Sequence, residues 1–392
     1  MSPAYRSSIN TETRPASEQE FRPLELGPLR VWPPVVLAPM AGVTNYPFRQ
    51  ICREFGAGLY VSEMITARGL VGGNRKTAQL AQFGPDEKPR SIQFYGTDPR
   101  YLAEATRLLV GEGRVDHIDL NFGCPVRKVM AQGGGAAIPY KPRVLASLVR
   151  SVVHAAGDVP VTIKVRKGID EAHLTYRTSG EVARDEGCKA IGLHARTAAQ
   201  LYDGLSDWHA IADLKSHVPE IPVLGNGDIW EPWDALRMLR QTRCDGVIVG
   251  RGCLGRPWLF RDLVDVFEGR EPQALPGLGT VITIMRDHAR RLVAFFEEYI
   301  GIRHMRKWCA WYTKGFQGTA PVRRRLAQIT SLSEFDAILD EMDPATPIIL
   351  EAIRSTRAKH SGRQTPALPA GYLDDPADDS LPGLECETVD GG

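Results

Sequence analysis

The 392-residue chain carries 48 lysine and arginine residues against 47 aspartate and glutamate residues, so its formal net charge is only +1. This balance excludes a protein that binds nucleic acid through its overall positive charge, but it permits a basic face on one part of the surface. Hydrophobic residues make up 43% of the sequence, which is enough for a large buried core. No apolar run reaches the roughly 18 residues of a membrane span, and the N-terminus lacks the apolar segment of a signal peptide, so we expect a cytoplasmic protein without a membrane partner.

The two ends of the chain differ in composition from the rest. Residues 1–25 are rich in Ser, Thr, Pro, Glu and Arg without an apolar period, and residues 361–392 hold seven acidic residues against Arg363 alone. Such segments bury too little apolar area to offset the entropy lost on ordering. We therefore expect a disordered N-terminal extension over 1–25 and a disordered acidic tail over 361–392.

Eight short apolar runs recur about every 30 residues, with stretches of helical pattern between them. They are Val35–Ala38, Leu59–Glu63, Arg90–Tyr95, His117–Asn121, Val161–Arg166, Ala190–His194, Pro222–Asn226 and Gly246–Gly250. The runs are short, rich in β-branched residues and apolar on both faces, which is typical of buried parallel strands. Eight strand–helix units over residues 26–275 predict an α/β fold of the (β/α)8 TIM-barrel type, with a doubly wound sheet as the alternative.

The pattern changes after residue 275, where the chain has helical periodicity and few strand signals. The expected helices are Val281–Tyr299, Gly301–Phe316, Pro321–Gln328, Ser333–Leu339 and Pro347–Lys359. We expect residues 276–360 to form a small all-α helical bundle domain.

The helical domain has a lopsided charge. Residues 281–330 hold ten basic residues against three acidic ones, with Trp308, Trp311 and Tyr312 among them. A basic face with aromatic side chains suits the phosphate backbone and unstacked bases of RNA. The alternative is a solvated helical face over an aromatic core.

Polar and small residues gather where the eight predicted strands end. They are Pro39, Met40 and Ala41, Gln93, Asn121 and Cys124, Lys164 and Arg166, His194 and Arg196, Asn226, Gly227 and Asp228, and Gly250 and Arg251. In a barrel the carboxyl ends of the strands share one rim, which carries the active site. We therefore expect these side chains to line one site.

The ends of the last two strands have the composition of a phosphate site. Their glycine-rich loops expose backbone N–H groups, and Arg251 adds a fixed positive fork. Lys164 on the opposite side suits the negative charge of a reduced flavin ring, so the pattern favours bound flavin mononucleotide (FMN), with Gln93 and Asn121 at the polar edge of the ring. Gly250–Gly255 also matches the dinucleotide fingerprint G-x-G-x-x-G, but it follows the eighth strand instead of the first, so this match is weak.

Cys124 is the most informative of the seven cysteines, none of which forms a Cys-x-x-Cys pair. It lies in a Gly-Cys-Pro turn directly after a strand, at the expected catalytic rim. A thiol with an ordinary pKa is mostly protonated at neutral pH and can serve as an acid. We expect the other cysteines to be reduced packing residues and no metal to be bound.

Several segments, in this order, resemble the tRNA-dihydrouridine synthases. They are LAPMAGVTNYPFR (37–49), IDLNFGCP (118–125), VTIKVRKG (161–168), HARTAAQLYDG (194–204), LGNGDI (224–229) and GVIVGRGCLGRPWLF (246–260). RKWCAWYTKGF (306–316) is similar to the helical tRNA-binding domain of the bacterial B-type branch. The resemblance implies an FMN enzyme that uses NADPH, or alternatively NADH, to reduce the C5–C6 double bond of particular uridines in tRNA to 5,6-dihydrouridine.

The resemblance also implies roles for individual residues. Cys124 would protonate C5 of the uracil after hydride transfer from N5 of the flavin to C6. The residues implied to bind the cofactor are Pro39, Met40, Ala41, Gln93, Lys164, His194, Asn226, Gly227, Asp228, Gly250 and Arg251. Those expected to contact the tRNA substrate are Asn121, Arg166, Arg196, Arg306, Lys307 and Lys314.

Some positions depart from the family pattern. We expect Ala198 and Trp308 to alter contacts with tRNA, and Ala136 and Ala195 to alter loop packing. Two other functions stay open: an FMN enzyme acting on free pyrimidines, such as a dihydroorotate or dihydropyrimidine dehydrogenase, and a non-catalytic RNA-binding module. The basic helical domain argues against the first and the intact Cys124 and Lys164 against the second. We expect a monomer.

Overall fold

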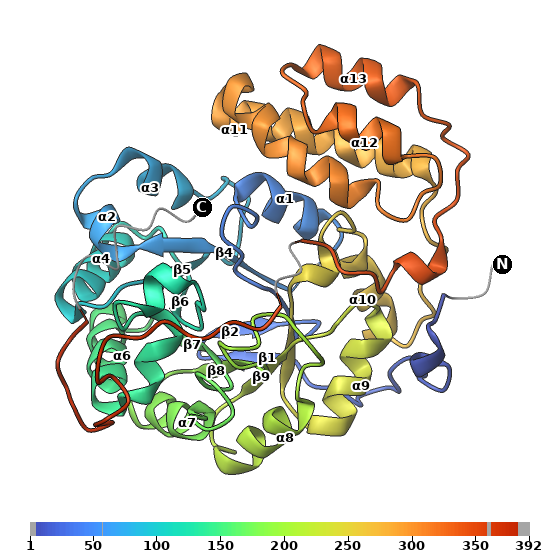
Figure 1. Ribbon diagram of the computed structural model, residues 1–392. Coiled ribbons are helices and arrows are strands. Elements are labelled where there is room, and N and C mark those ends of the chain that lie inside the picture. The colour runs from blue at the N-terminus through green and yellow to red at the C-terminus, as the bar shows by residue number, and fades with distance from the viewer. Residues whose placement is uncertain (1–4, 57, 359–361, 383–392) are drawn as a thin grey trace.

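A computed structural model describes residues 5–56, 58–358 and 362–382 of the chain (Figure 1). Its centre is a closed barrel of eight parallel strands in the order β10-β3-β4-β5-β6-β7-β8-β9. The strands are β3 (Val35–Leu37), β4 (Leu59–Thr66), β5 (Ser91–Tyr95), β6 (His117–Phe122), β7 (Val161–Arg166), β8 (Ala190–His194), β9 (Val223–Asn226) and β10 (Gly246–Val249). The pairing of β10 with β3 closes the sheet, so the TIM-barrel prediction is confirmed and the doubly wound alternative is excluded.

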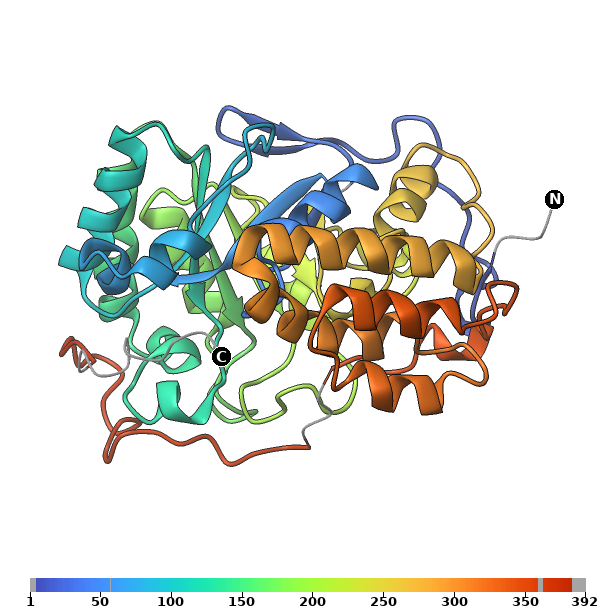
Figure 2. The same cartoon turned by 90° about the horizontal axis from the view of Figure 1, so that it is seen from above.

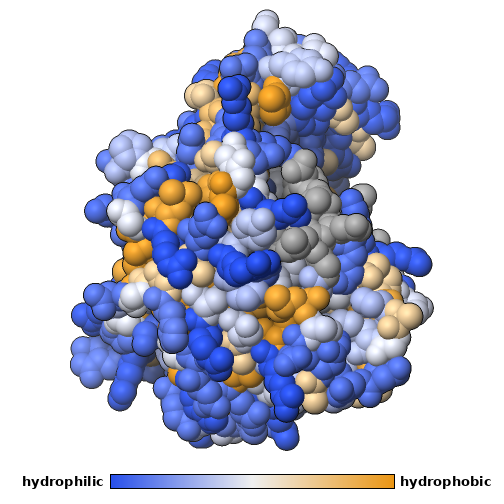
Figure 3. All heavy atoms as spheres, turned by 90° about the vertical axis from the view of Figure 1, so that its left-hand side faces the viewer, coloured by the Kyte–Doolittle hydropathy of each residue, from blue (hydrophilic) through white to orange (hydrophobic). Residues whose placement is uncertain are grey.

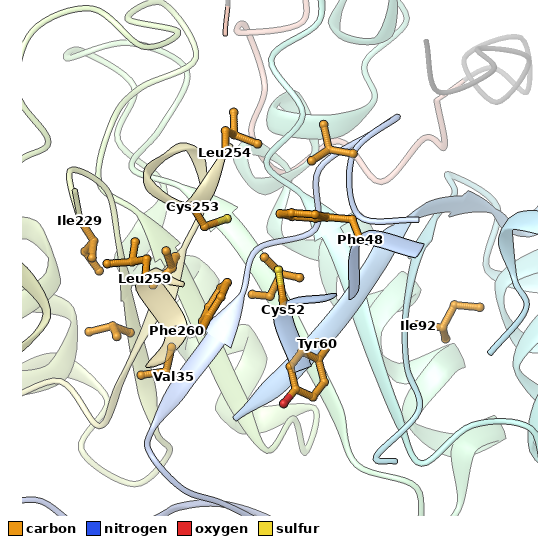
Figure 4. Close-up of a cluster of buried hydrophobic side chains, with 14 of the residues drawn as sticks. Val35, Phe48, Cys52, Tyr60, Ile92, Ile229, Cys253, Leu254, Leu259 and Phe260 are labelled. Atoms are coloured by element: carbon orange, nitrogen blue, oxygen red, sulfur yellow. The ribbon is translucent and has the colours of Figure 1, made fainter. Parts of the chain in front are cut away.

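Helices alternate with the strands and cover the outside of the barrel. They are α1 (Tyr46–Glu54), α2 (Ala67–Val71), α3 (Arg75–Leu80), α4 (Pro99–Gly111), α5 (Arg127–Met130), η2 (Gly135–Tyr140), α6 (Pro142–Ala156), α7 (Tyr176–Asp185), α8 (Trp208–His217), α9 (Pro232–Thr242), η3 (Arg251–Cys253) and α10 (Leu259–Phe267). The side chains of Asn45 and Asp98 accept hydrogen bonds from the first turns of α1 and α4, which fixes where these helices begin. Side chains from β3, α1, β4 and α10 meet in one apolar cluster, with Phe48, Cys52 and Phe260 fully buried (Figure 4).

A short hairpin closes the amino end of the barrel. Its strands β1 (Leu24–Leu26) and β2 (Leu29–Val31) pair antiparallel. Leu24, Leu26 and Val31 pack against barrel residues that include Val36 and Leu224. Because this end is filled with apolar side chains, the site lies at the other end, where the strands finish.

The N-terminal segment packs on the barrel over residues 5–25, so the expected disorder is wrong there. The hydroxyl of Tyr5 donates to Asp262 Oδ2 at 2.6 Å, and Trp233 Nε1 donates to the carbonyl of Tyr5 at 3.0 Å. The side chain of Asn10 is also buried, where it donates to Glu231 at 2.8 Å. These hydrogen bonds of Tyr5 and Asn10 with residues of α9 and α10, and with the residue before α9, fix a segment whose composition is otherwise polar. Residues 1–4 lie outside the described part of the chain.

Most of residues 278–340 form helices, and the first of these helices packs against α1 (Figures 1 and 2). This helical region contains α11 (Leu278–Tyr312), α12 (Ala320–Leu326) and α13 (Leu332–Asp340). Helix α11 is broken at Glu297, whose φ of 65° reverses the chain, so that Gly301 packs on the backbone of Leu292. The two helices predicted on either side of residue 300 are the two arms of this hairpin.

The last predicted helix, Pro347–Lys359, is not formed; this segment contains only the 3-10 turn η4 (Leu350–Ala352). Part of its backbone is hydrogen-bonded to residues 315–316 instead of forming the bonds of a helix. Ile349 N donates to the carbonyl of Gly315 at 2.8 Å, and Phe316 and Ile348 form an antiparallel bridge. Lys359 itself lies outside the described residues.

Two aromatic residues of α11 join the helical region to the barrel. The rings of Trp308 and Phe48 lie 4.4 Å apart, and Trp308 and Tyr312 both contact the buried His288. Because Trp308 and Tyr312 are fully buried, the expectation that they face RNA is wrong and the aromatic-core alternative holds for them. Trp311 differs, since it remains partly exposed and faces a cavity.

The C-terminal residues 362–382 lie on the barrel rim, so the expected disorder is wrong for this part of the tail. Tyr372 is buried beside Met130 and Ala137, and these apolar contacts anchor the acidic residues around it. On the face shown in Figure 3, hydrophilic residues predominate and apolar ones occupy separate areas between them. No helix within the described ranges is both long and apolar enough to cross a membrane.

Candidate active site

Two adjoining pockets open at the carboxyl ends of the barrel strands. The larger is a cavity of about 1000 Å³ between the rim and the helical region, and the smaller holds about 80 Å³. Both are lined by Pro39, Met40, Lys164, His194, Tyr202 and Arg251. Because they share these walls, the two pockets form one continuous site.

The smaller pocket is built from the ends of β9 and β10. Asn226 Nδ2 donates to the carbonyl of Ile248 at 2.8 Å, which ties the two strand ends together. Gly227 has a φ of 131°, and a Cβ there would lie 2.1 Å from Ser206 Oγ, so only glycine fits. The guanidinium of Arg251 lies 4.1 Å from the centre of the Tyr202 ring and makes no ion pair with any described residue. The pocket therefore offers an uncompensated positive charge beside glycine backbone.

Arg196 and Asp228 are placed differently from the prediction. The Arg196 guanidinium donates to both carboxylate oxygens of Asp228, at 2.7 and 2.8 Å, and Ser206 N donates to the same carboxylate. Asp228 thus holds Arg196 in the smaller pocket, away from the position expected for a substrate contact. Nη1 of Arg196 is buried without a hydrogen-bond partner, so it can serve an anionic group there.

Lys164 lies at the junction of the two pockets. Burial, together with the neighbouring charge of Arg166, lowers the pKa of Lys164 to about 8, although Asp119 opposes the shift. Burial together with the surrounding cations also lowers the pKa of His194, so its imidazole is neutral at physiological pH. The junction therefore has a positive lysine beside a neutral histidine.

A chain of amides crosses the floor of the larger cavity. Gln93 Nε2 donates to Asp119 Oδ2 at 2.6 Å, and Asn121 Nδ2 donates to Gln93 Oε1 at 3.1 Å. Gly123 N donates to Asn121 Oδ1 at 3.0 Å, which links the chain to the loop of Cys124. Burial raises the pKa of Asp119 to about 6. Sequence reasoning missed Asp119, although an acidic residue inside an apolar strand was a visible signal.

Cys124 faces the larger cavity with 8% of its surface exposed. Its carbonyl accepts from Ala136 N at 3.0 Å, and Arg166 Nε donates to the carbonyl of Gly123 at 3.0 Å. Burial raises the pKa of the Cys124 thiol above its ordinary value, and the backbone N–H of Val126 and the charge of Arg166 oppose this only in part. The thiol is therefore neutral at physiological pH and can donate a proton into the cavity.

The helical region supplies the outer wall of the cavity. Lys307, Trp311 and Lys314 line it, and Lys307 and Lys314 donate to the carbonyls of Gly42 and Thr356. Arg306 is not part of this wall, because its Nε donates to the carbonyl of Ile329 at 2.9 Å. The structure thus brings two of the three predicted basic residues of this region to the site.

Acidic residues of α13 and the following turn neutralise part of the basic face. Asp336 and Asp340 bind Arg286, and Glu341 binds Arg325. These acidic residues lie outside residues 281–330, over which the charge was counted. That count therefore overstated the unpaired positive charge of the helical region.

The sequence analysis assigned no role to the lining residue Tyr202 or to Glu63, which binds the loop after β3. The Tyr202 ring lies between Arg251 and Arg166, with Arg166 5.4 Å from its centre. Glu63, 2% exposed, accepts from Gly42 N at 2.7 Å and orients the loop after β3. Only the fold shows that Tyr202 lines the site and that Glu63 supports one of its loops.

A family model described as dihydrouridine synthase (Dus) matches residues 36–347. A "Probable tRNA-dihydrouridine synthase" of Mycobacterium tuberculosis (strain ATCC 25618 / H37Rv) is 48% identical over 92% of this chain and 94% of its own length. The "tRNA-dihydrouridine synthase B" of Pseudomonas aeruginosa is 39% identical over 80% of this chain and 93% of its own. Among solved structures, histamine dehydrogenase from Rhizobium sp. 4-9 aligns with a TM-score of 0.49 and 13% identity, over 82% of this chain and 63% of that one. The chain therefore belongs to the dihydrouridine synthase family, in its B-type branch.

Proposed function

We propose that the protein reduces the C5–C6 double bond of specific uridines in tRNA to 5,6-dihydrouridine, with FMN as its flavin and NADPH as its reductant. One observation carries the proposal: a cationic pocket built on glycine loops runs without interruption into a larger cavity that a protonated cysteine faces. Family membership supports the same reaction. Because its substrate is tRNA, we place the enzyme in the cytoplasm.

The residues of the smaller pocket fit a flavin phosphate. Arg251 lacks an ion-pair partner in the described chain, Arg196 has a buried nitrogen without a partner, and Gly227 lines the same pocket in a backbone conformation that suits glycine. Lys164 and Gln93 then lie where they can bind the electron-rich pyrimidine edge of the ring. When bound, the flavin supplies the hydride that C6 of the uracil accepts.

Cys124 supplies the proton in this scheme. Burial keeps its thiol neutral, and its position in the cavity suits donation to C5 of the base. The charge that develops on the uracil C4 carbonyl is favoured by the cationic surroundings, to which Arg166 contributes. Arg166 itself is fixed by its bonds to the carbonyls of Gly123, Thr197 and Leu201.

The outer wall favours a polynucleotide over a free pyrimidine. The cavity is much larger than one base needs, and Lys307 and Lys314 line its helical side. A uridine that enters it must leave its stack, at a cost of roughly a few kcal/mol, and lysine contacts to the flanking phosphates offset that cost. A free-pyrimidine enzyme has no use for this wall.

An anaerobic absorbance experiment tests the proposal. The flavin spectrum of the purified protein should bleach on addition of NADPH and recover on addition of tRNA that lacks dihydrouridine. Recovery with free uracil or orotate at the rate seen with tRNA would contradict the proposal and favour the free-pyrimidine enzyme. A purified protein that takes up no FMN would contradict both readings.

A further inference from the structure

Residues 362–382 form a strap along the barrel rim, here called the C-terminal strap (Figures 1 and 2). The strap is fixed at several points far apart in the sequence. The Tyr140 hydroxyl donates to the carbonyl of Leu373 at 2.8 Å, Lys141 pairs with Asp378, and Lys141 lies 4.5 Å from the centre of the Tyr372 ring. The strap therefore has a defined position over η2 and α5.

Apolar packing holds the same segment against the loop that follows Cys124. Tyr372, Leu368 and Leu373 pack on a cluster from that loop and its neighbours. The other members of the cluster are Met130, Ala136, Ala137, Tyr140, Ile169 and Ala198. Ala198 is fully buried in this cluster. The strap thus covers the outer side of the loop whose inner side presents the thiol.

Gln364 connects the strap to both walls of the cavity. Its Nε2 donates to the carbonyl of Pro125 at 2.9 Å and to that of Ala198 at 3.2 Å. Its backbone N donates to the carbonyl of Ala199 at 2.9 Å. One residue therefore ties the loop of Cys124 to the loop that carries Arg196 and Tyr202.

The bond to Pro125 acts next to the reacting thiol. Proline has no backbone N–H, so the carbonyl is the one backbone polar group of Pro125 that can be anchored. The carbonyls of Gly123 and Cys124 are already bound by Arg166 and Ala136, and Gln364 completes the series on the far side of the thiol. Without it, the carbonyl of Pro125 loses its bond to the strap, and among the described residues Arg166 alone joins this loop to the loop of Thr197 and Leu201 by side-chain bonds.

We propose that Gln364 is a positioning residue for the Cys124 proton donor, which it holds in place by joining the two rim loops. The proposal rests on the proposed function for the role of the thiol. Proton transfer requires the donor within hydrogen-bond reach of the acceptor atom, and a displacement of about 1 Å is enough to slow such a step strongly.

Two substitutions test the proposal in the full-length protein. Gln364→Leu removes the donor, and Gln364→Glu places a carboxylate against two carbonyl oxygens. In both, we expect tRNA to reoxidise the reduced flavin about tenfold more slowly in a single turnover, while NADPH reduces the flavin at the rate of the unchanged protein. Thr365→Val, at the exposed neighbouring position, is the matched control and should leave both rates unchanged.

Alkylation of Cys124 by iodoacetamide, followed by mass spectrometry, gives a readout that needs neither tRNA nor NADPH. A loosened loop should expose the thiol and speed its labelling several-fold, while the buried Cys188 stays unlabelled because the fold is intact. Unchanged labelling of Cys124 in both variants would overturn the positioning role, and so would equal acceleration at Cys188, which indicates general unfolding. If the proposed function is wrong, the protein without any substitution will also fail to reduce tRNA, so the two failures can be told apart.

Discussion

At the scale of single residues, the chemistry depends on how burial sets protonation. The Cys124 thiol is kept neutral because its charged form is desolvated, and the pKa of Lys164 is lowered to about 8 for the same reason. The two groups respond in opposite senses, since burial raises the pKa of an acid and lowers that of a base. Each shift leads to a prediction.

Replacing Cys124 by Ala or Ser should slow the reduction of tRNA by about 10²-fold or more, because the proton donor is lost. Reduction of the flavin by NADPH should be unaffected, since the thiol takes no part in it. In the protein without substitutions, the thiol stays protonated at pH values below its raised pKa. The rate of tRNA reduction should therefore fall only at pH values above the ordinary pKa of cysteine. Stopped-flow absorbance of the two half-reactions measures both effects, and a normal single-turnover rate in Cys124→Ala would refute the assignment.

Affinity of the flavin-free protein for FMN should weaken as the pH rises through about 8. The charge of Lys164 is present below that pKa and is lost above it, whereas His194 is already neutral over this range. Quenching of FMN fluorescence between pH 7 and 9 measures the affinity. Lys164→Met should bind FMN more weakly with no pH dependence in this interval; a retained dependence would mean that another group titrates.

At the scale of elements, α1 connects the barrel to the helical region. Its Arg49 is fully buried and donates to Glu87 at 2.6 and 3.0 Å and to the carbonyl of Thr44 at 2.9 Å. This charge cluster fixes α1 against the loop before β5, while Phe48 on the same helix packs on Trp308. The orientation of α1 therefore sets that of the helical region.

Glu87→Gln should lower the free energy of unfolding by about 3 kcal/mol, because it leaves the buried Arg49 without a counter-charge. The matched control is Glu112→Gln, whose ion pair with Arg114 is exposed. That change should cost less than about 1 kcal/mol. Urea unfolding followed by circular dichroism measures both, and equal small changes would show that Arg49 is stable without its partner.

At the scale of the whole molecule, the larger cavity depends on close packing of the helical region against the barrel. Gly255 has a φ of 66°, and a Cβ there would lie 2.3 Å from the backbone of Trp311. Because Trp311 and Lys314 line the cavity, any separation at Gly255 widens the site. The helical region can therefore pack this closely on the barrel only with glycine at position 255.

Gly255→Ala should lower the free energy of unfolding by at least about 2 kcal/mol more than Gly113→Ala, and it should weaken tRNA binding. Gly113 is a matched control because its φ of 58° imposes the same backbone strain but nothing lies within 4 Å of its added Cβ. Thermal unfolding and filter binding of tRNA measure the two effects. Similar values for both variants would show that the contact with Trp311 is loose.

The barrel and most of its rim could be predicted because each signal is local. Apolar runs of four to six residues with polar ends define strands whatever the rest of the chain does, and the turn of Cys124 follows directly from one of them. Side-chain partners were less predictable. The pairing of Asp228 with Arg196 depends on where two loops meet.

The sequence by itself determined the eight strand segments of the barrel, the helical character of the C-terminal region, and the rim on which Cys124 and Lys164 lie. Only the tertiary structure decided that Trp308 is buried while Trp311 faces the cavity, and that residues 5–25 and 362–382 pack on the barrel. The physical reason is the length of chain between partners: Tyr5 and Asp262 are 257 residues apart, and Gln364 and Pro125 are 239. Such contacts form because folding brings distant surfaces together, and no local pattern records which surfaces will meet.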